Sequence, residues 1–172
     1  MPILFSLIFY LIHWSARHGL RDDSDATSAS PVNGATSKEK FQRKEKARRT
    51  GLRGETYGYW YLRRHGYIFV AKNYIPHAAK GELDLVGYDG AILAFVEIRT
   101  RTIRDDTPAL PELSVTTSKQ GVLIRTAHRF LADRRLPACP TRFGVLAIDN
   151  VPGRLPVVCL HKDAFSPQLR HR

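Results

Sequence analysis

The chain has 172 residues, of which 43% are hydrophobic, and this is enough for one domain with a buried core. Lys and Arg together number 27 against 16 Asp and Glu, so the net charge is +11. Such an excess favours a polyanionic partner, either nucleic acid or an acidic membrane surface. The cysteines, Cys139 and Cys159, form no CxxC pattern, which argues against a zinc site or a disulfide and for a cytoplasmic protein.

The N-terminal part differs in composition from the rest of the chain. The apolar run in residues 2–14 is shorter than the roughly 20 residues of a transmembrane helix, and no basic segment precedes it as in a secretory signal. Residues 1–21 are therefore either a non-essential extension or a weak membrane anchor. Residues 22–37 have the composition of a disordered linker. The basic residues of 38–49 indicate either a solvated helix face or a segment that contacts phosphates.

A single α/β domain is predicted over residues 50–162, between the linker and basic segment (residues 22–49) and a basic tail (residues 163–172). Apolar residues at helical spacing predict helices, and alternating or β-branched runs predict strands. Asp89-Gly90 is a strong hairpin signal, and Pro156 would confine the last strand to a sheet edge. In chain order we expect a helix over 52–65, strands over 67–75, 82–88 and 91–101, a helix over 116–135, and strands over 143–148 and 157–160.

The predicted hairpin gathers charged residues on one face. With Asp89-Gly90 as a two-residue turn, Glu82 lies opposite Glu97 and Asp84 is diagonal to Glu97. Arg99 projects to the same side. The opposite side is the expected core face, formed by Leu83, Leu85, Val96 and Ile98.

Carboxylates that face each other across a hairpin need something positive to offset their repulsion. At about 5 Å and an effective dielectric constant of about 20, two ionised carboxylates repel by roughly 3 kcal/mol. Arg99, a raised pKa or a bound Mg²⁺ or Mn²⁺ could supply the compensation, since these ions prefer oxygen ligands. The alternative is an exposed ladder of ion pairs without function, which would contribute little to stability.

Glu55 is a third acidic candidate. It falls in the first turn of the predicted helix, near the face that turns inward. A glutamate at this position is stabilised by the helix dipole, which is explanation enough for its presence. Alternatively, the helix delivers a third carboxylate to the metal site suggested by the hairpin.

The order and spacing of several motifs resemble the YraN family of bacterial proteins. These proteins are similar to the PD-(D/E)XK restriction-endonuclease-like nucleases and to Holliday-junction resolvases. The resemblance spans about residues 48–150. Its motifs are Gly54-Glu55, Gly66-Tyr67, Lys72-Asn73, Gly81-Glu82-Leu83-Asp84-Leu85, Asp89-Gly90 and Phe95-Val96-Glu97-Ile98-Arg99.

The resemblance implies a restriction-endonuclease-like mixed sheet flanked by helices, in the order α-β-β-β-α-β-β. It implies Asp84 and Glu97 as ligands of Mg²⁺ or Mn²⁺, and Glu55 as a helix-borne acid. Position 99 corresponds to the catalytic lysine of the nuclease pattern, and Lys119 matches a lysine common in the family. The chain departs from the family at Arg99 and at Gly144, where the family commonly has Lys and Asp.

Two functions remain open from the sequence. The first is a metal-dependent endonuclease with Glu55, Asp84, Glu97 and Arg99 as catalytic residues. The second is a catalytically weak or inactive nucleic-acid-binding module, because Arg99 stays protonated and cannot act as a base. In either case the partner is DNA or RNA, with branched DNA and homodimer formation suggested by the resolvases. The expected nucleic-acid contacts are Lys119, Arg48, Arg49, Arg53 and Arg101.

Overall fold

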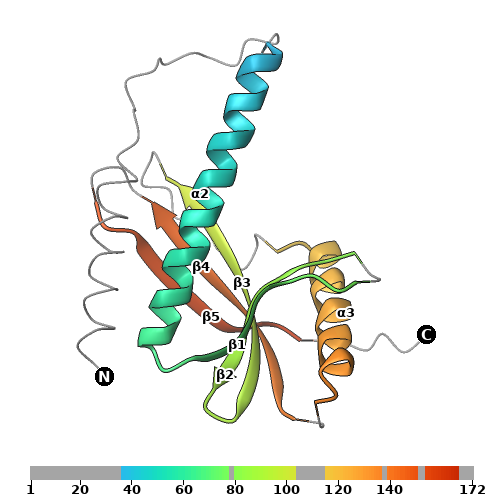
Figure 1. Cartoon of the computed structure of the whole chain (residues 1–172). Helices are drawn as coiled ribbons and strands as arrows, with labels where there is room; N and C mark the ends of the chain where they lie inside the picture. The colour runs from blue at the N-terminus through green and yellow to red at the C-terminus, as the bar shows by residue number, and fades with distance from the viewer. Residues whose placement is uncertain (1–35, 78–79, 104–114, 137–138, 151–153, 167–172) are drawn as a thin grey trace.

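The computed structural model describes residues 36–77, 80–103, 115–136, 139–150 and 154–166. Within these ranges the predicted order of a helix, three strands, a helix and two strands is confirmed (Figure 1). The elements are α2 (Ser37–Arg64), β1 (Ile68–Tyr74), β2 (Leu83–Asp89), β3 (Ile92–Thr102), α3 (Thr117–Asp133), β4 (Thr141–Asn150) and β5 (Val157–Phe165). The apolar run in residues 2–14, and most of the linker and basic tail, lie outside the described residues.

The five strands form one mixed sheet in the order β1-β2-β3-β4-β5. The β3–β4 pair is parallel and the other neighbours are antiparallel. A parallel pair needs a crossover connection, and α3 lies in the chain between β3 and β4. The strand after Pro156 is a sheet edge, as predicted. Within the described residues, the five-stranded mixed sheet and its two helices are compatible with a restriction-endonuclease-like fold.

Both faces of the central strands are buried, so the prediction of one core face is incomplete. Along β3, Phe95 belongs to the apolar cluster beneath α3, whereas Val96 and Ile98 belong to the cluster beneath α2. Side chains alternate along a strand, so the two helices cover opposite faces and the domain has three layers (Figure 1). Leu83 packs in the α3 cluster, not with Leu85 in the α2 cluster.

Helix α2 begins much earlier than predicted. Its C-terminal half packs on the sheet, and its blue N-terminal half extends beyond the sheet (Figure 1). Thr36 and Glu39 form a capping box that satisfies backbone N–H groups at the helix start. The basic segment of residues 38–49 is therefore helical. We call residues 37–53 of α2 the basic arm.

The hairpin turn is shifted by one residue from the prediction. Asp89 pairs with Ile92, so the turn residues are Gly90 and Ala91, and Gly90 has the positive φ of 63° that favours glycine. The carboxylate of Asp89 forms ion pairs with Arg142 and Lys162, which hold Asp89 in the strand. The predicted pairing of Glu82 with Glu97 is therefore wrong.

Candidate functional site

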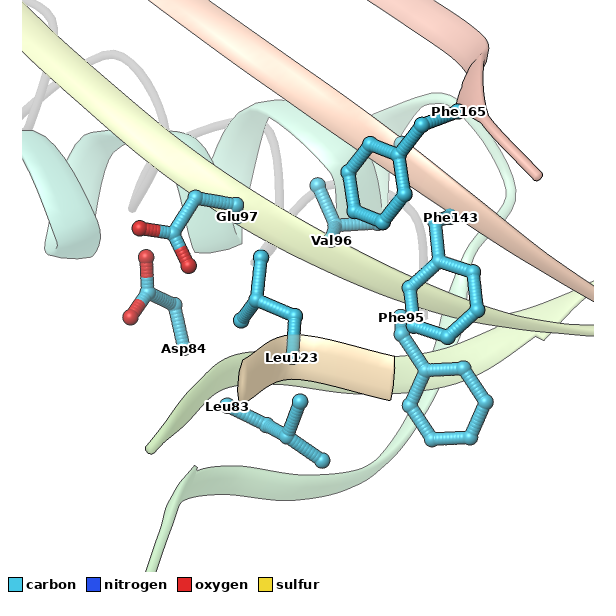
Figure 2. A pocket seen from close by; sticks show the side chains of 9 residues that line it. Leu83, Asp84, Phe95, Val96, Glu97, Leu123, Phe143 and Phe165 are labelled. Carbon is cyan, nitrogen blue, oxygen red and sulfur yellow. The ribbon is translucent and has the colours of Figure 1, made fainter. Parts of the chain in front are cut away.

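Asp84 and Glu97 face each other across β2 and β3. Leu85 pairs with Val96, so the next pair of positions along the ladder is Asp84 and Glu97. Moving a two-residue turn by one residue shifts the pairing by two positions, so the partner of Glu97 changes from Glu82 to Asp84 while Asp84 and Glu97 stay on the same side of the sheet. Figure 2 shows the two carboxyl groups pointing toward one another beside Leu123 of α3. The structure thus brings together the two predicted metal ligands.

Glu97 is buried, with 5% of its surface exposed, and its two carboxylate oxygens differ. Oε1 lies 3.2 Å from Lys119 Nζ and 3.3 Å from Arg99 Nη2. Among the described residues, Oε2 is buried without a hydrogen-bond partner. An unsatisfied buried charged oxygen costs free energy, typically about 1–3 kcal/mol or more. One oxygen is therefore neutralised by two cations, and the other is available to a further ligand.

The carboxyl group of Asp84 is in an environment that disfavours its charge. Burial, and next the nearby charge of Glu97, raise its pKa from 3.8 to about 7. The Ile98 backbone N–H, which donates to Asp84 Oδ2 at 2.7 Å, and the charge of Lys119 lower this pKa in part. Two carboxyl groups and two cations thus share a small, largely buried volume.

A divalent cation fits this donor set. Mg²⁺ and Mn²⁺ accept carboxylate oxygens, and Mg²⁺ usually retains several waters while binding one or two carboxylates. The unpartnered Glu97 Oε2 and the carboxyl of Asp84 would be the two carboxylate ligands of such an ion. In the part of the chain that the structure describes, no three His, Cys, Asp or Glu side chains form a metal-binding group.

Glu55 lies near this pair without completing a three-acid cluster. Its charge is close enough to raise the pKa of Asp84, and its Oε2 accepts a hydrogen bond from Asn73 Nδ2 at 3.0 Å. Asn73 has a φ of 50°, in the left-handed region that asparagine tolerates better than most residues. No role was predicted for Asn73, although it belongs to the Lys72-Asn73 motif. Its proximity to Glu55 depends on the packing of α2 beside β1, which local patterns do not contain.

The five residues predicted to contact nucleic acid lie in three places. Arg48 and Arg49 are on the basic arm and form ion pairs with Glu45, at 3.7 and 3.3 Å. Arg53 is exposed on the same arm. Arg101 forms a bidentate ion pair with Asp149, from Nε to Oδ1 at 2.5 Å and from Nη2 to Oδ2 at 2.8 Å. Lys119 of α3 contacts Glu97, so it is the predicted nucleic-acid contact that the structure brings to the carboxylate pair.

Gly144 occupies the position where the family pattern commonly has Asp. A Cβ there would lie 3.2 Å from the carbonyl oxygen of His161, at an irregularity in the β4–β5 pairing. The close approach of β5 leaves little room for a side chain at this position. Separately, none of the described helices has the length and apolar character needed to cross a membrane.

Comparison with known proteins identifies the family. The model of the family described as "Uncharacterised protein family UPF0102" matches residues 54–148, which include the acidic residues of the site. The UPF0102 protein Acid345_3985 of Koribacter versatilis (strain Ellin345) is 36% identical over 121 residues, covering 70% of this chain and 74% of that protein. The UPF0102 protein of Geobacter metallireducens is 38% identical over 116 residues, covering 67% and 90%. The chain therefore belongs to the UPF0102 family, identified above as YraN.

Proposed function

We propose that this protein binds nucleic acid and holds a divalent cation between Asp84 and Glu97 for phosphodiester hydrolysis. The observation that carries the proposal is the pair of facing carboxyl groups (Figure 2), of which Glu97 is buried and Asp84 half-buried. A sheet has no structural need for two adjacent acids, and burial makes their repulsion more costly. A ligand that is itself positive would relieve this cost. The net charge of +11 supports a polyanionic substrate.

The residues around Asp84 and Glu97 would have different roles in hydrolysis. Asp84 and Glu97 would hold Mg²⁺ or Mn²⁺. When bound, such an ion lowers the pKa of a water and neutralises charge on a phosphate. Lys119 and Arg99, which already contact Glu97, would also bind the phosphate of the substrate. Glu55 would add negative charge beside Asp84.

The second candidate is a binding module with weak or no turnover. It is favoured by Arg99, because a guanidinium stays protonated and cannot take a proton from water. Arg99 Nη2 is also engaged with Glu97. Both candidates share the metal site and the nucleic acid, and they differ in the rate of cleavage.

A cleavage assay tests the proposal. Wild type, Glu97→Gln and the control Asp149→Asn would be incubated with linear and branched DNA and with RNA, in Mg²⁺, Mn²⁺ or a chelator. We expect slow wild-type cleavage that needs the metal, survives Asp149→Asn and disappears in Glu97→Gln. Equal cleavage by wild type and Glu97→Gln would reveal a contaminating nuclease and contradict the site. Binding without cleavage by any variant would favour the binding module.

The substitution Arg99→Lys separates the two candidates. It keeps the positive charge and restores a side chain whose pKa can fall when it is buried, so that it can act as a base. General-base assistance is typically worth about 10²–10⁴-fold, so we expect single-turnover cleavage with Mn²⁺ to rise by up to this factor. A decrease would instead make the guanidinium of Arg99 a working catalytic group.

A further inference from the structure

A groove of about 480 Å³ lies between the basic arm of α2 and the end of β3. Its arm side is formed by Arg43, Lys46 and Thr50, and its strand side includes Arg99 and Arg101. The arm residues recur at the spacing of one helix face, so they project from α2 toward the strand together. The arm side of the groove precedes the segment that the family model matches, which begins at residue 54, whereas the strand side lies within that segment.

Two glycines explain why a groove opens at this point. A Cβ on Gly54 would lie 1.8 Å from Thr100 Oγ1, and a Cβ on Gly58 would lie 2.8 Å from Ile98 Cδ1. The helix therefore touches the sheet closely at these positions. A Cβ on Gly51, one turn earlier, would meet nothing within 4 Å, so the helix has already left the sheet there.

The groove is positive and leads to the carboxylate pair. Among its described lining residues, Arg43, Lys46, Arg99 and Arg101 are basic and Glu55 is the one acid, so the lining is positive. Arg99 lines the groove and also contacts Glu97, and Glu55 lines its inner end. Within the described chain, Arg99 Nε is a buried donor without an acceptor. An anion in the groove would meet two exposed cations and lie beside this unsatisfied donor.

From this geometry we infer that the groove holds the phosphates of a nucleic-acid strand that continues past the Asp84–Glu97 site. The inference rests on the proposed function and adds a second contact region to it. The substrate is then a strand that extends beyond the phosphate at the metal site, and not a mononucleotide or another small phosphate ester. The phosphate backbone is the part of the strand recognised here, because the lining offers positive charge.

A matched pair of double variants of the full chain tests the inference. Arg43→Gln/Lys46→Gln removes two charges that line the groove. Lys38→Gln/Lys44→Gln removes two charges from the same arm, and neither residue is among the described residues that line the groove. Binding of a labelled oligonucleotide of about 12 nucleotides would be measured by anisotropy over a range of NaCl concentrations, since each lost phosphate contact lowers the slope by about 1. A dinucleotide, and vesicles with anionic lipid, would be measured in parallel.

We expect the groove variant to lower the salt slope for the long oligonucleotide by about 2 and to leave dinucleotide binding unchanged. The control variant should lower the slope by less than half as much, and helicity by circular dichroism should match wild type in both. Equal losses in the two variants would overturn the groove, because charge on the arm would then act only as a diffuse field. A groove effect on vesicles and none on the oligonucleotide would assign the groove to a membrane surface.

A separate measurement tests the proposed function. A rise in melting temperature with Mn²⁺ measures metal binding by Asp84 and Glu97. The groove variant should show the same rise as wild type. If the rise persists and the groove variant binds like the control variant, the groove inference fails alone. If wild type binds neither Mn²⁺ nor nucleic acid, the proposed function fails with it.

Discussion

Two charged clusters lie along β3, and they are built differently. Arg101 meets Asp149 of β4 in a one-to-one pair, and both carboxylate oxygens of Asp149 accept hydrogen bonds. Four residues nearer the turn, Glu97 meets a second acid, Asp84, and the described residues leave one Glu97 oxygen without a partner. The first cluster is satisfied by the protein's own residues. The second holds two acids and two cations, and its unpartnered Glu97 oxygen can still accept a further cation or a proton.

The largest difference between the clusters should appear in the pH dependence of stability. The pKa of Asp84 is raised to about 7, mainly by burial and then by Glu97. A carboxyl group whose folded pKa is raised contributes stability that is complete below its unfolded pKa and is lost as pH rises through the folded pKa. Without metal, stability should therefore fall between about pH 4 and pH 7, by at most about 4 kcal/mol.

Substitution isolates the contribution of Asp84. Metal-free Asp84→Asn should be more stable than wild type above pH 7, because asparagine resembles the protonated acid and carries no charge. Urea unfolding from about pH 5.5 to pH 8 measures this difference, since ΔG falls linearly with urea. Asp149→Asn serves as the control and should retain the pH dependence. A wild-type stability that stays level over this range would mean that Asp84 is not held in a charge-disfavouring environment.

The next largest effect is stabilisation by a divalent cation. Mn²⁺ at about 100 times its dissociation constant would stabilise the folded state by about 2.7 kcal/mol, or about 5–11 °C in melting temperature for a chain of this size. Asp84→Asn should abolish the rise because it removes one of the two ligands. The rise should grow from pH 6 to pH 8, because a proton and the metal compete for the same carboxyl group. An equal rise in wild type and Asp84→Asn would place the ion elsewhere.

Much of the fold could be predicted because its signals are local. Period-two runs marked the strands, the apolar spacing of residues 116–135 marked α3, and Pro156 marked the edge strand. The start of α2 was missed because the basic arm is charged on most sides and has no apolar period. One signal was present: Thr36 followed by Glu39 has the spacing of a capping box.

The site was predictable in part for a geometric reason. The predicted turn was wrong, yet Asp84 and Glu97 were placed on one face, because moving a two-residue turn by one residue shifts the pairing by two, the period of a strand. The correct register depends on Asp89 meeting Arg142 and Lys162, more than 50 residues away in the chain. The groove beside the arm depends on Gly54 touching Thr100, another contact between distant segments. Contacts of this kind leave no local pattern.

The smallest expected effect belongs to the satisfied cluster. Asp149→Asn removes the charge from a partly buried pair, and its cost should lie between that of an exposed ion pair and that of a buried one, at about 1–2 kcal/mol. The pKa of Arg101 is raised first by its hydrogen bond to Asp149, so the guanidinium stays charged and the loss should vary little from pH 6 to pH 9. Urea unfolding of metal-free protein gives the loss. The Mn²⁺-induced rise in melting temperature should be the same as in wild type. If Asp149→Asn instead stabilised the protein and abolished the Mn²⁺ effect, the roles assigned to the two clusters would have to be exchanged.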